Sequence, residues 1–295
     1  SAEGLSLTRE IEKGGGRGLA AIPNEGTFSK KEDTKMLRLS PFITVYCCTV
    51  AALLGACTGS FLGCLAWRTV HGESVLRGRS HCDVCGHTLG VRDLVPVFSY
   101  LFSGGKCRYC GAKLSARHVW GEAVSAAVFA TLLLRYDISL QTLEGWLLAC
   151  VLLACAFADL EGYIIPDRFI AAGVVLFAVT LLIEPEPFRR LADGLLGGVG
   201  VGGGLLLLSL YMDKRLKRET LGGGDVKLLF LTGLFFGWKG NLLCLTLACV
   251  AGIAWGLAGK RRGEAIPWGP SIAVGAWITA LAGQMFIDWY LGFFA

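Results

Sequence analysis

The chain has 295 residues, of which 54% are hydrophobic and only 17% charged, and its formal net charge is +5. So apolar a composition excludes an ordinary soluble domain, and several apolar runs are long enough to cross a bilayer. Strand-like alternation is absent, and membrane spans without it are helical, so the sequence predicts an all-α polytopic membrane protein.

The chain begins with a polar stretch, residues 1–40, which is predicted to be a disordered N-terminal tail because it contains no apolar run. About eight candidate transmembrane segments follow. They are residues 42–67, 119–134, 142–158, 169–183, 191–212, 226–238, 241–258 and 268–287. The sixth and seventh meet at Lys239 and Gly240, so we expect a tight helical hairpin or a partly re-entrant pair there.

Lysine and arginine gather in alternate connections between these segments. Fifteen lie in three basic loops, residues 68–117, 213–218 and 260–262, and four lie in the connections on the other side. The positive-inside rule therefore places the three loops in the cytoplasm. Membrane topology thus explains the net charge, no nucleic-acid partner is expected, and the basic loops are predicted to contact anionic membrane lipids.

The large cytoplasmic loop, residues 68–118, contains two Cys-x-x-Cys pairs. Cys82 and Cys85 form the first, and Cys107 and Cys110 follow after 21 residues. This spacing is typical of a zinc ribbon, in which four thiolates surround the metal. Because four protein ligands leave no open position, we predict a structural zinc; disulfides and a redox pair are disfavoured alternatives. The other eight cysteines lie in apolar segments and are expected to be small buried residues.

Two aspartates occur at the ends of apolar segments that should reach the same membrane face. Asp159 ends the third segment and Asp225 begins the sixth, after Gly222, Gly223 and Gly224. Two carboxylates that share a site can act together as general base and general acid on a water molecule. The three glycines are predicted to let an extended peptide substrate approach closely. The alternative is that Asp225 only complements a helix dipole and that the glycines form a flexible turn.

Five separated motifs then resemble one known family, the bacterial type IV prepilin peptidases, which are GxGD membrane aspartyl proteases. The motifs stand in the family's order and span the chain from about residue 40 to its end. They are "GSFLGCLAWR", the cysteine loop from "RSHCDVC" to "HVWGE", "DLEGYIIPDR", "GGGDVKLL" and "PWGPSIAVG". The form "LGGGD" is a mild departure from the family's usual motif, and the 35 leading residues have no counterpart in it.

The resemblance implies that Asp159 and Asp225 are the catalytic aspartates and that residues 119–295 form the transmembrane protease core, behind the first transmembrane helix at 41–67. It implies cleavage of the basic leader from type IV prepilins or pseudopilins at the cytoplasmic face of the bacterial inner membrane. Many family members then methylate the new N-terminus with S-adenosylmethionine, and the four loop cysteines resemble those of this bifunctional branch. No residue pattern of a methyl-donor pocket is recognisable, and the sequence assigns no oligomeric state.

Two other function classes share some of these features. Another GxGD protease, of the preflagellin or signal-peptide peptidase type, would have the two aspartates but is expected to lack the paired cysteine loop. A proton-coupled transporter could use Asp159 and Asp225 as a relay, but it would have no need of a zinc ribbon. The cysteine loop therefore favours the prepilin peptidase.

Overall fold

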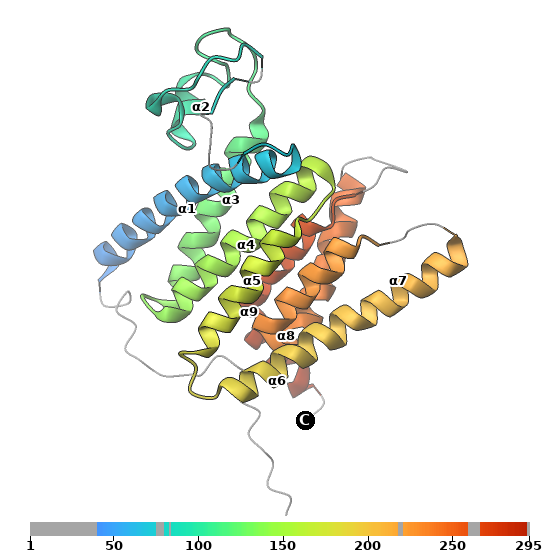
Figure 1. The fold of residues 1–295 in the computed structure, drawn as a ribbon. Coiled ribbons are helices and arrows are strands. Elements are labelled where there is room, and N and C mark those ends of the chain that lie inside the picture. Colours follow the sequence, from blue (N-terminus) through green and yellow to red (C-terminus); the bar gives the residue numbers. More distant parts are fainter. Residues whose placement is uncertain (1–39, 75–79, 83, 218–220, 259–265, 294–295) are drawn as a thin grey trace, which may run out of the picture. The chain divides into compact units, whose positions relative to one another are not determined.

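The computed structural model describes residues 40–74, 80–82, 84–217, 221–258 and 266–293 (Figure 1). The predicted disordered tail lies outside these residues, apart from Ser40. The described residues are mostly helical and contain no strand beyond two isolated bridges. The helices are α1 (Pro41–Val70), η2 (Val91–Asp93), α2 (Phe98–Phe102), α3 (Ala116–Tyr136), α4 (Leu140–Gly162), α5 (Asp167–Leu181), α6 (Pro187–Gly197), η3 (Gly198–Gly202), α7 (Gly203–Leu216), α8 (Gly223–Ala258) and α9 (Gly269–Gly292).

All eight predicted apolar segments are helical over most of their length, which confirms the fold class. Within the described residues, six helical stretches are long and apolar enough to cross a membrane, so the chain is a multi-pass membrane protein. The eight segments map onto fewer long helices for two reasons. α5 has only 15 residues and is about 22 Å long, shorter than a bilayer core. The sixth and seventh segments belong to one element, α8.

α8 is a helical hairpin, as one of the two sequence expectations proposed. Gly237 interrupts it with φ 65° and ψ −174°, a conformation that favours glycine. The Thr232 hydroxyl donates a hydrogen bond to Asn241 Oδ1 at 2.8 Å, although a straight helix would separate these residues by about 13 Å. The Asn241 amide also donates to the carbonyl oxygens of Leu229 and Gly197, and its side chain is fully buried. Asn241 therefore joins both arms of the hairpin to the end of α6.

The hydrophobic core gathers around α4 and the first arm of α8. Cys155, Ala158, Leu228 and Leu231 have no exposed surface, and buried residues of α1, α5 and α9 complete the same cluster. Of the eight cysteines in apolar segments, only Cys155 and Cys244 are buried. The expectation of burial was wrong for the other six, because on helices that face lipid a thiol can remain at the apolar surface of the bundle.

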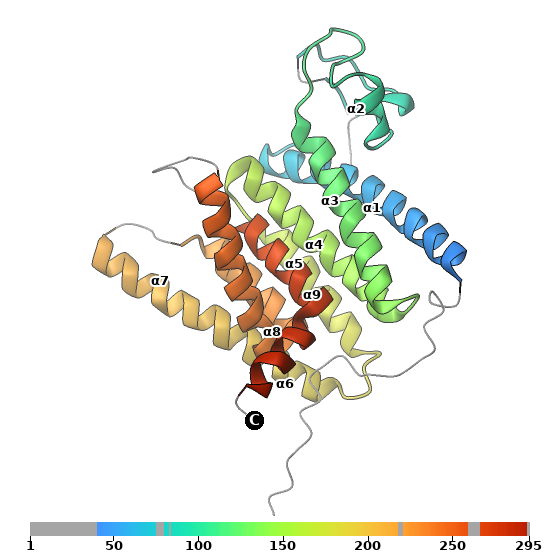
Figure 2. The same cartoon turned by 180° about the vertical axis from the view of Figure 1, so that it is seen from behind.

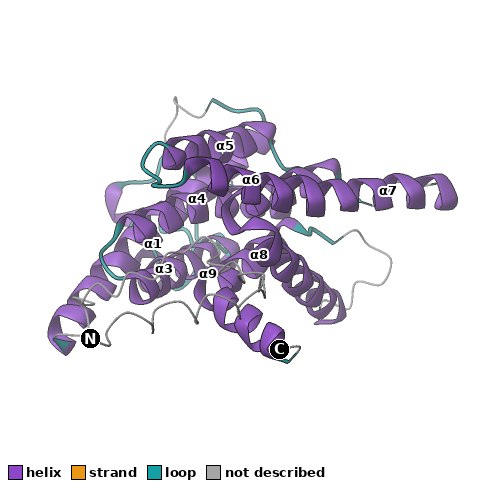
Figure 3. Ribbon diagram, turned by 90° about the horizontal axis from the view of Figure 1, so that it is seen from below, coloured by secondary structure: helices purple, strands orange, loops and turns teal. Residues whose placement is uncertain are grey.

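The helix that follows α5 changes its winding where it meets the hairpin. η3 is a π-helix built from glycine and valine, and it separates α6 from α7. A Cβ at Gly233 would lie 2.3 Å from the backbone nitrogen of Gly198, so the two backbones touch without side chains between them. Beyond this contact α7 extends away from the first arm of α8, which Figures 1, 2 and 3 all show.

An ion-pair cluster is buried where α4, α5 and α6 meet at the other end of the bundle. Arg190 pairs with Glu144 and, at 2.7 Å, with Glu184, and its side chain is only 9% exposed. Its guanidinium also lies over the Phe177 ring. Arg190 is one of the four basic residues in the connections on the other side from the basic loops, and no sequence pattern indicated that it is buried. Removing one partner of such a buried pair lowers the stability of the fold, because the other charge stays buried without compensation.

Candidate active site and cysteine cluster

The two aspartates lie at the same end of the bundle, where the ends of four helices meet. Asp159 lies in the last turn of α4 and is 5% exposed, and Asp225 lies in the first turn of α8 and is half-buried. The two carboxylates are close enough to repel each other electrostatically. The N-terminal ends of α5 and α9 form the rest of the site. Repulsion of this kind favours a state in which only one of the two carboxylates is ionised.

The chain reaches this arrangement because α8 starts against the segment that leaves α4. A Cβ at Gly224 would lie 2.9 Å from Cβ of Ile165, which is buried. At the same place Lys227 forms an ion pair with Asp167, the first residue of α5, at 2.6 Å. Gly224 is thus needed for close packing of α8 on the residues after Asp159. Substrate approach, the role predicted for the three glycines, stays a prediction.

The three glycines before Asp225 differ in what surrounds them. A Cβ at Gly222 would lie 3.1 Å from the carboxylate of Asp225, whereas one at Gly223 would meet nothing within 4 Å. The Asp225 backbone N–H donates to the Gly222 carbonyl oxygen at 3.1 Å, and this hydrogen bond closes the first turn of α8. Asp225 therefore occupies a helix N-terminus, as the dipole alternative also expected.

Asp159 has a partner that the sequence reasoning missed. The backbone N–H of Gly269, the first residue of α9, donates to Asp159 Oδ2 at 2.7 Å. A Cβ at this position would lie 2.9 Å from the same oxygen. The motif "PWGPS" contains Gly269 and was recognised in the sequence, but nothing in it indicates which side chain its backbone will contact.

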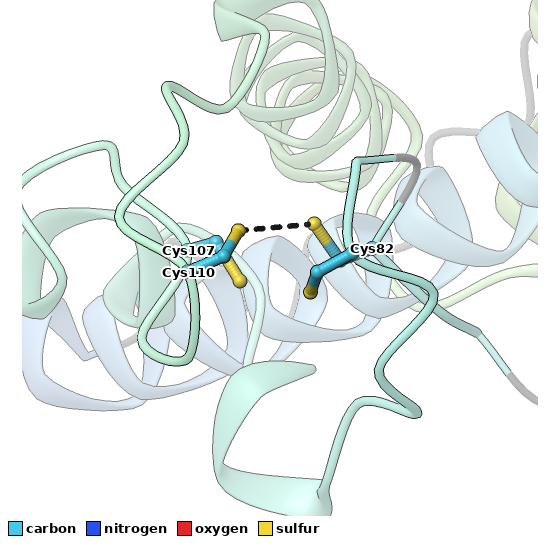
Figure 4. A group of neighbouring side chains, drawn as sticks. Cys82, Cys107 and Cys110 are labelled. Atoms are coloured by element: carbon cyan, nitrogen blue, oxygen red, sulfur yellow. Dashed lines mark hydrogen bonds between the residues drawn. The ribbon is translucent and has the colours of Figure 1, made fainter.

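The four loop cysteines come together in one cluster at the ends of two knuckle-shaped turns. Their sulfur atoms all lie within 4.8 Å of one another. Figure 4 shows Cys82, Cys107 and Cys110 with their sulfurs facing, and Cys82 Sγ and Cys110 Sγ are 3.9 Å apart. Tetrahedral zinc with Zn–S bonds of about 2.3 Å places its sulfurs about 3.8 Å apart. The cluster can therefore hold a metal ion.

Each knuckle has the same local structure. The sequences "CDVCG" and "CRYCG" both end in a glycine with positive φ, Gly86 at 68° and Gly111 at 71°. In each, the glycine N–H donates to the carbonyl oxygen of the first cysteine. Backbone N–H groups of Cys85 and Val84 that point at the Cys82 sulfur lower the pKa of that thiol to about 7. This favours the thiolate that a metal requires.

Polar and aromatic contacts hold the two knuckles together. His87 packs on Tyr109 with ring centroids 3.7 Å apart. The Tyr109 hydroxyl donates to Asp93 at 3.1 Å, and this hydrogen bond raises the pKa of Tyr109. Arg108 pairs with the same carboxylate at 3.4 Å. Asp93 therefore ties the second knuckle to the segment between the cysteine pairs.

The cysteine loop is anchored at the aspartate end of the bundle. Arg117, near the end of the loop, pairs with Glu161, two residues beyond Asp159, at 3.2 Å. A Cβ at Gly162 would lie 2.5 Å from a methyl carbon of Val70, which is the last residue of α1 and lies near the start of the loop. Both ends of the loop thus contact the end of α4 that carries Asp159.

A buried glutamate joins the loop to α3. Glu122 is 8% exposed and accepts a hydrogen bond from the Val97 backbone N–H at 2.7 Å. This contact gives Glu122 a structural role. Val97 has φ 61°, which is unusual for a β-branched residue, so the contact holds a strained backbone in place.

Most of the chain matches models of known protein families. Residues 53–136 match the family model described as bacterial peptidase A24 N-terminal domain, and residues 146–257 match that of the type IV leader peptidase family. A relative from Aeromonas hydrophila, named prepilin leader peptidase/N-methyltransferase, is 32% identical over 72% of this chain and 74% of its own length. The chain belongs to the type IV leader peptidase family.

Other relatives with the same name agree. The Bacillus subtilis (strain 168) protein is 28% identical over 82% of this chain and 97% of its own length, and the Dichelobacter nodosus protein is 31% identical over 78% and 84%. No solved structure matched the chain. In this leader peptidase the first matched stretch contains the cysteine cluster and the second contains both aspartates, whereas Gly269 follows both.

Proposed function

We propose that this chain is a prepilin peptidase that uses Asp159 and Asp225 to cleave the basic leader from type IV prepilins and pseudopilins. The observation that carries the proposal is the meeting of these two aspartates at one end of the bundle in a member of the leader peptidase family. The cysteine cluster favours this function over other GxGD proteases, which are expected to lack it.

The chemistry needs one proton shared by the two carboxylates. The ionised carboxylate takes a proton from water while the water oxygen bonds to the scissile carbonyl carbon. The protonated carboxyl gives its proton to the carbonyl oxygen, which yields a neutral gem-diol. When the C–N bond breaks, the first carboxyl protonates the leaving nitrogen and a gem-diol hydroxyl returns its proton to the second, so the pair ends in its starting state.

The end of the bundle that carries the two aspartates is proposed to lie at the cytoplasmic face of a bacterial inner membrane. Both ends of the basic cysteine loop contact the end of α4 that carries Asp159. The positive-inside rule then puts loop and aspartates on the cytoplasmic side. A prepilin with a basic leader followed by an apolar helix would present its cleavage site at this depth.

The cluster of Cys82, Cys85, Cys107 and Cys110 is proposed to hold a structural zinc ion. Four ligands fill a tetrahedral site, so the metal would stabilise the loop and leave no position for substrate. The convergence of the four sulfur atoms supports this proposal. Elemental analysis of the purified protein tests this directly, with one zinc per chain expected and none in a Cys82→Ser, Cys107→Ser variant.

A second activity, N-methylation of the new N-terminus, is proposed because the relatives are named N-methyltransferases. S-adenosylmethionine would supply the methyl group. The proposal assigns no residue of this chain to that cofactor.

Mass spectrometry of a purified prepilin incubated with the protein in detergent tests both activities. Loss of the leader is expected with the wild-type protein and with Asp288→Ala, a matched control because Asp288 is exposed near the end of α9. Asp159→Ala and Asp225→Ala should leave the prepilin uncut. An additional methyl group should appear on the product only with S-adenosylmethionine. Cleavage that survives in either aspartate variant would overturn the assignment of the pair.

A further inference from the structure

The hydrogen bond from Gly269 distinguishes the two aspartates. Asp159 Oδ2 accepts the N–H that begins α9, at 2.7 Å and in a buried position. Asp225 instead lies beside the glycine turn that precedes it. An oxygen that accepts a backbone N–H favours the ionised form of its carboxylate. The two carboxylates are therefore not equivalent before any substrate binds.

The donor cannot easily move away from Asp159. Trp268, just before it, donates its indole N–H to the Ala248 carbonyl oxygen at 3.4 Å and packs over Gly252. Ile272, one turn later, is fully buried. The second arm of α8 thus fixes the start of α9 on one side, while Asp159 lies on the other.

Only glycine allows this contact. A Cβ at position 269 would lie 2.9 Å from Asp159 Oδ2, closer than real Cβ atoms approach, and 3.2 Å from Asp159 Cβ, tighter than most real Cβ contacts. Pro270 follows, and it has no N–H to offer in place of the lost donor. A side chain at 269 would therefore push the carboxylate away from the donor, with no other donor in reach from the next residue.

We infer that Gly269 is a positioning residue that holds Asp159 as the ionised general base of the pair, so that Asp225 carries the shared proton and acts as the general acid. The inference rests on the proposed protease function. In this division of roles, Asp159 takes the proton of the attacking water and Asp225 protonates the substrate carbonyl oxygen.

Among the residues that the structure describes, two titratable groups interact electrostatically with Asp159. They are Asp225 on α8 and Cys155 on α4. Two described carboxylates near this end are in ion pairs, Glu161 with Arg117 from α3 and Asp167 of α5 with Lys227. Arg168 of α5 donates to the Thr69 carbonyl oxygen at 3.5 Å. The first turn of α9 has no ionisable side chain. Arg68, in the last turn of α1, donates a hydrogen bond to the Ser74 carbonyl oxygen.

The pH profile of prepilin cleavage by a Gly269→Ala variant tests the inference. We expect kcat to fall about 10- to 100-fold with KM little changed, which is typical of losing one hydrogen bond to a charged group. The acid limb of the profile should also move to higher pH by about one unit, because ionised Asp159 loses its donor. Circular dichroism and gel filtration would show that the variant is folded.

Two matched variants separate positioning from packing. Gly204→Ala, on α7, adds the same methyl group in open space and should leave both rate and profile unchanged. Gly275→Ala, also on α9, would bring its Cβ within 2.6 Å of the Cys244 carbonyl oxygen and so disturbs the helix without touching Asp159. It should reduce the rate without moving the acid limb. Equal profiles for Gly269→Ala and Gly275→Ala would overturn the inference.

A second variant, which makes a side chain smaller, tests the inference if Gly269→Ala does not fold. Trp268→Phe loses the indole hydrogen bond that fixes the start of α9, and it should move the acid limb in the same direction by a smaller amount. An unmoved limb in this variant would also overturn the inference. If wild-type protein cleaves prepilin and both aspartates are required, such a failure leaves the proposed function intact; if they are not required, the proposed function itself fails.

Discussion

Replacement of Gly224 by alanine tests how the chain brings Asp225 to Asp159. The new Cβ would lie 2.9 Å from Ile165 Cβ, 3.4 Å from its Cγ1 and 3.5 Å from its Cδ1. Carbon atoms prefer separations of about 3.5 to 4.0 Å, so α8 must shift by roughly 1 Å. Ile165 cannot rotate away, because the contact involves its Cβ and the residue is buried.

The expected losses can be given a size. Overpacking costs about 1–3 kcal/mol of stability, offset by up to about 1 kcal/mol because alanine is a better helix former than glycine. The effect on activity should be larger, since a misplacement of about 1 Å at a reacting group can cost about 100-fold in rate. Gly224→Ala should thus cleave prepilin tens of times more slowly while it melts only a few degrees lower.

Gly223→Ala is the comparison that decides between two explanations of the glycines. Its Cβ would meet nothing within 4 Å in the protein, so packing predicts a much smaller loss than for Gly224→Ala. Initial rates per folded enzyme, with melting temperatures in the same detergent, measure both. If Gly223→Ala is as slow as Gly224→Ala, the packing argument is refuted and close approach of the substrate explains the whole glycine run.

Three further predictions concern stability and metal. Arg190→Gln leaves Glu144 charged and buried, so it should lower the free energy of unfolding by about 3–5 kcal/mol. The neighbouring Arg189→Gln, in an exposed ion pair, should lower it by less than about 1 kcal/mol. Thermal unfolding in detergent measures both. Asn241→Ala removes three buried hydrogen bonds and should cost about 2–4 kcal/mol. Thr246→Ala, exposed on the same arm, should be nearly neutral by the same assay. Zinc should leave the four cysteines as the pH falls, because protonated thiols do not bind it, and a colorimetric chelator would record its release; zinc retained at pH 4 would contradict a thiolate site.

The sequence predicted the helices and the cysteine cluster because both depend on local patterns. Apolar runs set the positions of the helices, and the spacing of two Cys-x-x-Cys pairs set the four ligands. It also predicted the hairpin at residues 239–240, close to the turn at Gly237. Each of these features can be read within a few tens of residues.

Contacts between distant segments could not be predicted in the same way. The N–H of Gly269 meets a side chain 110 positions earlier, and Arg190 meets Glu144 from another helix. A backbone donor has no residue type of its own, so no sequence pattern reveals which acceptor it will find. The helix ends that surround Asp159 follow from tertiary packing, which hydropathy does not determine.

The helix dipoles act against the roles inferred for the two aspartates. Their contribution must therefore be compared with that of the hydrogen bond from Gly269. Asp159 lies at a helix C-terminus and Asp225 at a helix N-terminus, so the two dipoles favour charge on Asp225 by about 0.3–1 kcal/mol each. A hydrogen bond to a charged group contributes about 1.5–3 kcal/mol, and the dipole of α9 adds to it on the side of Asp159. The hydrogen bond from Gly269 therefore outweighs the helices' own dipoles. Without that donor the balance reverses, and this is why a single methyl group at position 269 should change the pH profile of the enzyme as well as its rate.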